Sequence, residues 1–324
     1  MDVRFLRVST FNEFLMTIAV TGGTGLVGRF VVDKLLGHQH DVRVLARSMD
    51  GKESFGERQN LIDWHFGDMN DTTSVDSFLS NVDAVVHAAF THLPGRFRGG
   101  EGDDPERFWE QNFVGTLRLV ERARRAGVSR VVMLSSRAVF DGLDFEPEEI
   151  GDQEPPSPTT HYGLIKAAIE QLAELYNDIA ICSVRPTGIY GLTHPRSKTK
   201  WWKMLTNHIS GPGDVPVDSS SRTEVHGSDV AAAISLLLSA NESKMQGKSF
   251  NCSDIVTSEQ QILKLTQRIV NEGPILSSVD LDPLEKPKNT MASRALVSLG
   301  WKPGGFRRLT TTLEQIVQLA GMRR

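Results

Sequence analysis

Residues 17–28, which read Thr-Ile-Ala-Val-Thr-Gly-Gly-Thr-Gly-Leu-Val-Gly, join a short apolar run to a glycine cluster. Residues 18–20 suffice for one buried strand, and an apolar periodic segment from Leu26 to Leu36 follows the glycines at once. Backbone N–H groups at such a helix start lack intrahelical partners, and the helix dipole favours negative charge there. Glycine removes the Cβ that would keep a pyrophosphate away from the backbone. The stretch therefore predicts a strand, a tight turn and a helix N-terminus that together hold a phosphate.

The glycine spacing is a weak signal by itself, because Gly23, Gly25 and Gly28 would also satisfy G-x-G-x-x-G in a turn that binds no ligand. The strand expected before it and the helix expected after it strengthen the phosphate-binding interpretation. Thr21, Gly22, Gly25 and Gly28 also supply T-G-x-x-G-x-x-G, which resembles the pattern of the extended short-chain dehydrogenase/reductases of the epimerase/dehydratase-like group. The resemblance implies an α/β fold: a Rossmann-type, doubly wound parallel sheet with a smaller C-terminal substrate domain.

The composition is that of an ordinary soluble globular protein of 324 residues, 39% hydrophobic and 23% charged. The net charge of −4 and the lack of a long basic cluster argue against a nucleic-acid surface. No stretch approaches the ~18 apolar residues that a membrane span needs. Cys182 and Cys252 lack metal or redox spacing, so we expect buried thiols, a cytoplasmic protein and no metal site.

Three segments are expected from the change of character along the chain. Residues 1–15 form an N-terminal extension, which has neither the long apolar core nor the cleavage site of a signal peptide. Residues 16–190 form the dinucleotide-binding Rossmann domain. Residues 191–324 are mainly a substrate-binding region, but the part around residues 225–253 returns to the Rossmann domain.

The second expected strand, residues 41–46, bears on the choice of dinucleotide. An acidic residue at the end of this strand binds the ribose 2′-hydroxyl of NAD, whereas a nearby arginine suits the 2′-phosphate of NADP. Ala46 stands at the position that is acidic in NAD-using relatives, and Arg47 follows it. Because a guanidinium matches the geometry of a phosphate, we expect NADP to be preferred over NAD. The alternative is that Arg47 stacks on the adenine or faces solvent.

The resemblance implies further dinucleotide contacts. Asp68, after the third expected strand, contacts the adenine amino group, and small residues at the end of the fourth strand let the backbone pass close to the dinucleotide. An Arg-Pro pair after the sixth strand lines the nicotinamide. The complete expected set is Gly22, Thr24, Gly25, Leu26, Val27, Gly28, Arg47, Asp68, Met69, Ala88, Ala89, Lys166, Arg185 and Pro186.

The catalytic group is expected where Tyr162 and Lys166 begin a helix, since a spacing of four places both on one face. A phenol with a pKa of about 10 is a poor base at neutral pH, and an ammonium within reach would lower that pKa. A serine hydroxyl across the site would orient the substrate oxygen, and the resemblance assigns this role to Ser136. It also gives Asn112, in the N-x-x-G-T pattern of a helix at residues 105–126, a supporting role. Such a set would move a proton to or from an alcohol while hydride is exchanged with a nicotinamide.

Candidate substrate residues surround this group; they are Ser135, Arg137, Thr187, Trp201 and Arg222. The indole of Trp201, beside basic residues, either covers an anionic or sugar-like substrate or packs between the two domains. By the resemblance, Arg222 meets a substrate phosphate in nucleotide-sugar members. Gly188, however, replaces the Asn that binds the phosphates in those members, which weakens that substrate class. The loop at residues 90–104 is either a substrate lid or a solvated loop.

These features lead to three functional hypotheses. The first is an NAD(P)-dependent oxidoreductase in which Tyr162 is the general acid/base for hydride transfer to or from a carbonyl or alcohol carbon of a small molecule. The second is an NAD-dependent sugar or nucleotide-sugar epimerase, which Arg222 favours and which Gly188 and Arg47 disfavour. The third is a non-catalytic, dinucleotide-sensing relative that kept the fold. The resemblance also implies a homodimer, formed by the helices at residues 105–126 and 162–176.

Overall fold

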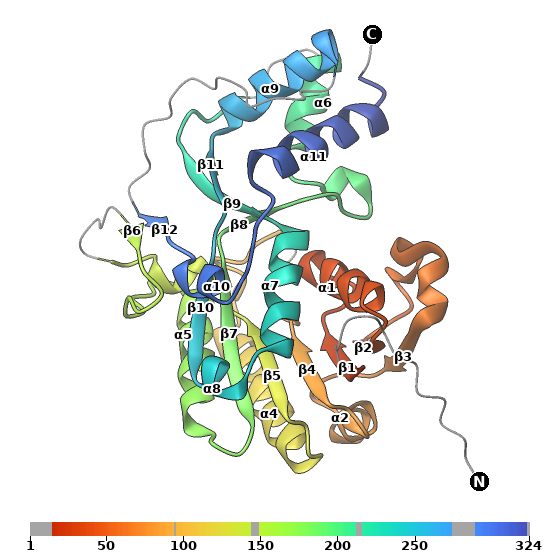
Figure 1. Cartoon of the computed structure of the whole chain (residues 1–324), viewed down its shortest axis with the longest axis vertical. Coiled ribbons are helices and arrows are strands. Elements are labelled where there is room, and N and C mark those ends of the chain that lie inside the picture. Colours follow the sequence, from red (N-terminus) through yellow and green to blue (C-terminus); the bar gives the residue numbers. More distant parts are fainter. Residues whose placement is uncertain (1–14, 94, 144–148, 212–215, 274–288, 323–324) are drawn as a thin grey trace.

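The computed structural model describes residues 15–93, 95–143, 149–211, 216–273 and 289–322, so the expected N-terminal extension lies, except for Leu15, outside the described residues. The centre of the fold is a parallel sheet of seven strands in the order β10-β7-β5-β4-β1-β2-β3 (Figure 1). Its strands are β1 (Thr17–Thr21), β2 (Asp41–Ala46), β3 (Ile62–Phe66), β4 (Ala84–His87), β5 (Arg130–Leu134), β7 (Ala180–Pro186) and β10 (Lys248–Cys252). The strand order reverses between β1 and β4, which is where ligands bind in open α/β sheets.

Both faces of this sheet are buried, because its strands are apolar at consecutive positions rather than at alternate ones. In β1, Ile18 and Val20 join one hydrophobic cluster, and Ala19 joins a second cluster on the opposite face. The first cluster holds side chains of α1 (Leu26–Gly37) and α7 (Gly227–Ser239), and the second holds those of α2 (Thr72–Leu79), α4 (Gly115–Arg125) and α5 (His161–Leu172). The expected doubly wound sheet is therefore confirmed.

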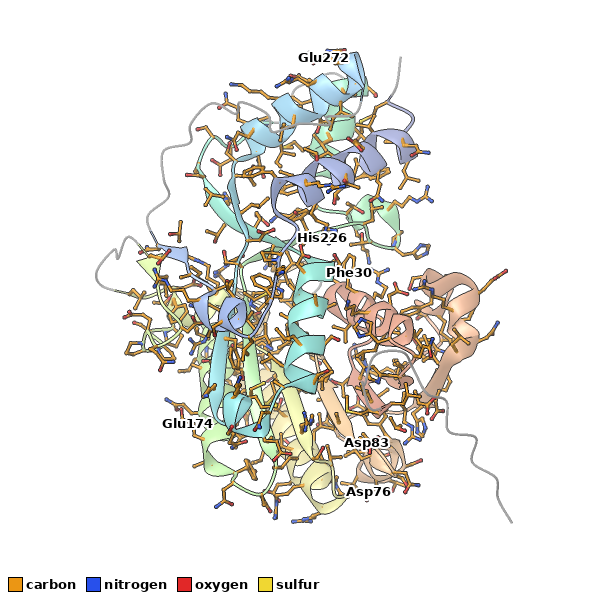
Figure 2. All side chains as sticks on the ribbon, in the orientation of Figure 1. Phe30, Asp76, Asp83, Glu174, His226 and Glu272 are labelled. Carbon is orange, nitrogen blue, oxygen red and sulfur yellow. The ribbon has the colours of Figure 1, made fainter. Side chains whose placement is uncertain are left out.

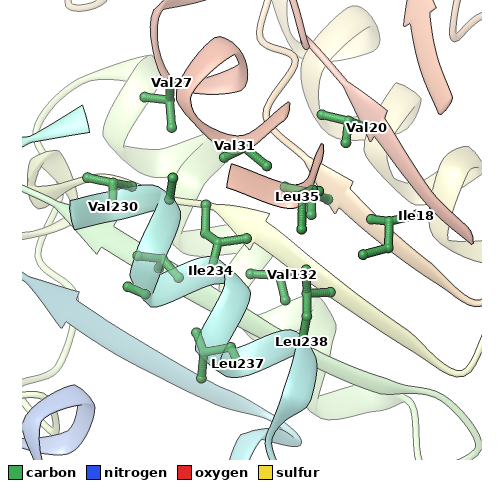
Figure 3. Close-up of a cluster of buried hydrophobic side chains, with 14 of the residues drawn as sticks. Ile18, Val20, Val27, Val31, Leu35, Val132, Val230, Ile234, Leu237 and Leu238 are labelled. Carbon is green, nitrogen blue, oxygen red and sulfur yellow. The ribbon is translucent and has the colours of Figure 1, made fainter. Parts of the chain in front are cut away.

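Helices α1 and α7 pack together, although they are far apart in the sequence. Figure 3 shows apolar side chains of both helices meeting above the sheet. Gly227 permits this close approach, because a Cβ at that position would lie 2.2 Å from Cδ2 of Phe30 in α1. The segment expected to return to the main domain, around residues 225–253, thus contributes both α7 and the edge strand β10 to it.

A second, smaller sheet has the strand order β11-β9-β8, in which β8 and β9 are parallel and β9 and β11 antiparallel. Its strands are β8 (Gly188–Tyr190), β9 (Arg222–His226) and β11 (Ile255–Thr257). Side chains of α6 (Trp202–Ser210), α9 (Glu259–Glu272) and α11 (Gly305–Leu319) form a separate core with Tyr190 and Ile255 of this sheet. These elements lie together at the upper end of the molecule in Figure 1.

The helix expected at residues 105–126 is interrupted. It consists of α3 (Pro105–Trp109), a π-helical segment η2 (Glu110–Val114) and α4. The sequence analysis also missed a two-stranded sheet of β6 (Glu149–Ile150) and β12 (Thr290–Met291). The remaining elements are η1 (Lys52–Leu61), η3 (Arg137–Phe140), η4 (Ala173–Leu175), η5 (Arg196–Lys198), α8 (Glu242–Met245) and α10 (Arg294–Ser298).

The described residues were compared with what a membrane span, a metal site and a reactive thiol each require. None of the helices in the described ranges is both long and apolar enough to cross a membrane. Among the same residues, no three His, Cys, Asp or Glu side chains gather in a way that could hold a metal ion. Cys182 and Cys252 are both buried free thiols, as expected, and burial raises the pKa of each.

Candidate active site

A pocket of ≈ 790 Å³ opens at the carboxyl ends of β1, β4 and β5, beside the point where the strand order reverses. It also reaches the small sheet, since residues of β8 and β9 line it. The predicted site residues that line it are Gly22, Thr24, Gly25, Leu26, Val27, Gly28, Arg47, Asp68, Met69, Ala88, Ala89, Ser135, Ser136, Arg137, Tyr162, Lys166, Pro186, Thr187 and Arg222. Asn112, Arg185 and Trp201 do not line it.

The glycine loop fits a dinucleotide pyrophosphate. Gly22 has φ = +69°, and a Cβ there would lie 2.6 Å from the Ala89 nitrogen; a Cβ on Gly28 would lie 2.0 Å from the Gly22 oxygen. Side chains at these two positions would therefore push the loop off the end of β4 and off the first turn of α1. Gly25 is the N-cap of α1 and provides no side-chain cap, so the first N–H groups of the helix stay available to a phosphate.

Ser136, Tyr162 and Lys166 come together in the same pocket. Tyr162 and Lys166 lie in the first turns of α5, after the N-cap Thr160, whose side chain accepts a hydrogen bond from the Gly163 nitrogen at 3.1 Å. The Ser136 hydroxyl is hydrogen-bonded to the Tyr162 hydroxyl. The Lys166 ammonium lies 6.0 Å from the Tyr162 ring centroid and donates to the Leu134 carbonyl at 2.5 Å.

The expected lowering of the Tyr162 pKa by Lys166 does not occur in this arrangement. Burial raises the pKa of Tyr162, while the hydrogen bond from Ser136 and the charge of Arg98 act against it. Lys166 is held instead by the Leu134 carbonyl and lies 4.5 Å from the ring centroid of Phe90. Burial lowers the pKa of Lys166 to about 7, against the opposing charge of Glu170. The ammonium is thus easily neutralised near neutral pH in this arrangement.

The loop at residues 90–104 covers the tyrosine. The ring centroid of Phe90 lies 5.0 Å from that of Tyr162, and the centroid of Phe97 lies 5.7 Å from it. Arg98 fixes the loop through a bidentate contact with Asp141, at 2.5 and 2.8 Å. The sequence analysis gave Phe90 and Phe97 no role, although aromatic residues after a central parallel strand were an available signal.

Asn112 acts on this loop from outside the pocket. Its amide oxygen accepts from the Thr91 nitrogen at 2.7 Å, and its amide nitrogen donates to the carbonyls of Thr91 and Phe108, both at 2.9 Å. The side chain lies in the π-helical segment η2 and is 3% exposed. Asn112 therefore positions the start of the loop, and the structure gives it no direct place in the pocket.

Arg185 and Ser135, which were expected to contact the nicotinamide and the substrate, both bind the buried carboxylate of Glu170. Arg185 donates to Glu170 from Nε at 2.9 Å and from Nη2 at 2.7 Å, so its guanidinium is turned away from the expected nicotinamide site. Ser135 lines the pocket, but its hydroxyl donates to the same Glu170 carboxylate. The sequence analysis missed Glu170, which lies one turn beyond Lys166 on α5.

The His87 ring, at the end of β4, is held between two buried hydroxyl groups. Its ring nitrogens lie 2.7 Å from the Thr21 hydroxyl and 2.9 Å from the Thr116 hydroxyl. Burial, with the charge of Lys166, lowers the pKa of His87 to about 3. The neutral ring therefore links β1, β4 and α4 beneath the glycine loop.

Arg222 and Trp201, the two expected substrate residues of the C-terminal part, lie in different places. Arg222 lines the pocket, but its guanidinium is paired with Asp218. Trp201 packs in the small core, where its ring centroid lies 5.5 Å from that of Tyr190. Trp201 therefore packs between other side chains, as one of its two expected roles required, and it does not line the pocket.

Comparisons with known proteins agree with this geometry. Residues 18–253 match the model of the NAD dependent epimerase/dehydratase family. A UDP-glucose 4-epimerase of Corynebacterium glutamicum is 28% identical over 310 residues, covering 89% of this chain and 91% of that protein. A UDP-glucose 4-epimerase of Lacticaseibacillus casei is 26% identical over 319 residues, covering 89% and 92%.

Solved structures show the same fold. The UDP-glucose 4-epimerase of Thermus thermophilus, in complex with NAD, has a TM-score of 0.71 at 22% identity, over 94% of this chain and 99% of that one. Together with the glycine loop and the family match over most of the chain, this fold assigns the sequence to a family of NAD-dependent enzymes. The chain belongs to the NAD-dependent epimerase/dehydratase family, within the extended short-chain dehydrogenase/reductase superfamily.

Proposed function

We propose that this protein catalyses hydride transfer between a nicotinamide dinucleotide and a secondary alcohol or carbonyl carbon of a small molecule, with Tyr162 as the general acid/base. One observation carries the proposal: a partly buried tyrosine hydroxyl, hydrogen-bonded to Ser136, shares one pocket with the glycine loop and with Lys166. Such a grouping of a proton donor, a second hydroxyl and a cation is what alcohol–carbonyl chemistry requires.

In the direction of alcohol oxidation, the Tyr162 oxygen takes the hydroxyl proton of the substrate while Ser136 donates a hydrogen bond to the substrate oxygen. In the reverse direction, the same tyrosine returns the proton to the carbonyl oxygen. The bound nicotinamide accepts or supplies the hydride. Since burial raises the pKa of Tyr162, the resting phenol suits the reductive direction, and a nearby positive charge is needed for the oxidative one. Arg98 provides such a charge.

Sugar epimerisation is the second candidate, favoured by two UDP-glucose 4-epimerases that align over most of their own length. In that reaction the hydride returns to the opposite face of the same carbon, so the nucleotide need not leave.

The two candidates differ in how tightly they hold the nucleotide. The purified protein is denatured, and the nucleotide that it releases is quantified. Little bound nucleotide, together with oxidation of added NADPH or NADH by a panel of carbonyl compounds, is the expected result for the oxidoreductase. About one equivalent of retained NAD(H), without such oxidation, would contradict it and favour the epimerase.

Dinucleotide preference is expected to depend on Arg47, an exposed residue of the pocket that follows the buried Ala46. We propose that Arg47 binds the 2′-phosphate of NADP, so Arg47→Asp should weaken NADPH binding by about 10- to 100-fold relative to NADH, as the loss of a charge-assisted hydrogen bond implies. Fluorescence titration with both nucleotides measures the ratio. Arg58→Asp, an exposed arginine paired with Asp33 at 3.1 Å and outside the pocket, is the matched control. An unchanged ratio in the Arg47 variant would assign this side chain to adenine stacking or to solvent.

The homodimer implied by the resemblance would use α4 and α5, and we propose that arrangement here. Leu164, on α5, is 48% exposed and offers an apolar contact on the outer side of this helix. Tyr162 and Lys166 lie on the same helix, so such an interface would lie directly behind the catalytic group.

A further inference from the structure

The small sheet brings an acidic side chain into the pocket. Glu224 of β9 is paired in register with Gly188 of β8, and both line the cavity that also contains the glycine loop. Glu224 is 3% exposed, which is rare for a carboxylate without full compensation. The sequence analysis assigned Glu224 no role.

The Glu224 carboxylate is only half satisfied. Its Oε1 accepts from the Lys200 ammonium, whereas Oε2 is buried and receives no hydrogen bond from the part of the chain that the structure describes. The Thr187 hydroxyl, which also lines the pocket, is likewise buried without a partner there. Buried polar atoms are normally hydrogen-bonded, so two oxygens without partners, on residues that line one cavity, favour a ligand that supplies hydrogen-bond donors.

Gly188 and Glu224 are coupled by their packing. A Cβ on Gly188 would lie 2.5 Å from Oε2 and 2.6 Å from Oε1 of Glu224, so the carboxylate occupies the space that a side chain at position 188 would need. The nucleotide-sugar members that the sequence resembles carry an Asn at this position, which binds phosphates there. In this chain the Glu224 carboxylate, a negatively charged hydrogen-bond acceptor, thus stands where an Asn side chain would offer an N–H donor.

We propose that Glu224 and Thr187 determine specificity by binding a hydroxyl group of a substrate that carries no phosphate at this position. This proposal rests on the hydride-transfer function proposed above and specifies its substrate. A phosphate would meet the Glu224 carboxylate, and like charges in contact cost several kcal/mol. Two cations line the pocket near Glu224, and both have carboxylate partners: Lys200 contacts Glu224, and Arg222 contacts Asp218. Lys200 contacts Oε1, so Oε2 is the acceptor without a partner among the described residues, and the single donor of a neutral hydroxyl group matches it.

The test uses the full chain, saturated with the dinucleotide that it binds more tightly, and isothermal titration calorimetry. The probes are UDP-glucose, UDP, and a panel of unphosphorylated polyols and methyl glycosides. We expect wild-type protein to bind at least one unphosphorylated probe more tightly than UDP-glucose. Glu224→Gln should weaken that binding and should strengthen UDP binding by more than about tenfold, because the repulsion is removed.

Two further variants make the result decisive. Glu272→Gln makes the same chemical change at the far end of α9, well away from His226 at the end of β9 (Figure 2), and should leave both affinities unchanged. If Glu224→Gln does not fold, as judged by its circular dichroism melt, Glu224→Ala combined with Gly188→Asn removes the charge and fills its space with an amide. This double variant should bind UDP more than about tenfold more tightly than wild type does.

Tighter binding of UDP-glucose than of every unphosphorylated probe by wild type would overturn the proposal, as would wild-type protein that binds none of the unphosphorylated probes. These titrations record binding alone. A protein that shows the expected preferences but transfers no hydride would therefore contradict the proposed function and leave the assignment of Glu224 intact.

Discussion

Replacement of Tyr162 by phenylalanine is expected to lower kcat by about 10²- to 10⁴-fold, the range that a positioned general acid or base contributes. The substitution removes the hydroxyl that is hydrogen-bonded to Ser136 and keeps the ring that packs against Phe90 and Phe97. Dinucleotide affinity should therefore change little, so that the loss appears in turnover. Steady-state kinetics, combined with fluorescence titration of the nucleotide, separates these two effects.

The matched control for this substitution is Tyr176→Phe, which removes a hydroxyl that donates to Glu121 at 2.8 Å outside the pocket. This variant should keep wild-type turnover. The pH profile gives a second check, since alcohol oxidation needs the phenolate and should accelerate as pH rises toward the raised pKa of Tyr162, whereas carbonyl reduction needs the phenol and should slow. Full turnover in Tyr162→Phe would revive the hypothesis of a non-catalytic dinucleotide sensor.

Replacement of Arg185 by methionine is expected to reduce the free energy of unfolding by about 3–5 kcal/mol, the usual result of removing one partner of a buried ion pair. Arg185 is 4% exposed and makes two hydrogen bonds to the Glu170 carboxylate, at 2.7 and 2.9 Å. Without the guanidinium, that carboxylate stays buried with only the Ser135 hydroxyl and the nearby Lys166 charge to stabilise it. Equilibrium unfolding in urea, followed by circular dichroism, measures the change.

A double variant distinguishes a charge effect from a packing effect. Glu170→Leu combined with Arg185→Met should be more stable than Arg185→Met alone, because it removes the carboxylate that the single variant leaves buried without its arginine partner. Arg124→Met is the half-buried counterpart; Arg124 contacts the exposed Asp178 at 3.0 Å, and its loss should cost less than the loss of Arg185. A cost for Arg185→Met no larger than that for Arg124→Met would show that the buried pair contributes little to stability.

The parts of the pocket whose position follows from the sequence depend on local geometry. The glycine loop follows from conformational constraints within a few residues, and the Tyr162–Lys166 pair follows from the period of a helix. The sheet could be predicted because short apolar runs alternate with amphipathic segments. Each of these signals lies within one strand-turn-helix unit and needs no information about distant parts of the chain.

The contacts that the sequence did not predict join distant segments. Arg185 lies beside a motif that suggests the nicotinamide, but its partner Glu170 is on a different element, and no local pattern pairs them. The pKa of Tyr162 depends on burial and on Arg98 from the covering loop, neither of which can be read from the Y-x-x-x-K spacing. Glu224 was missed because a buried carboxylate cannot be distinguished from a solvated one in a single sequence.

The order of the central sheet has a consequence for synthesis on the ribosome. Strand β7 has β10 as its outer neighbour, and β10 comes only at residues 248–252, after the small sheet has begun. Until then, the nascent chain exposes an unpaired strand edge, and α1 lacks the cover that α7 later gives it. A polypeptide released at residue 190 would carry the whole nucleotide loop but would keep both of these surfaces exposed. The newly made protein therefore needs shielding from its neighbours until nearly four-fifths of it (about 252 of 324 residues) has emerged.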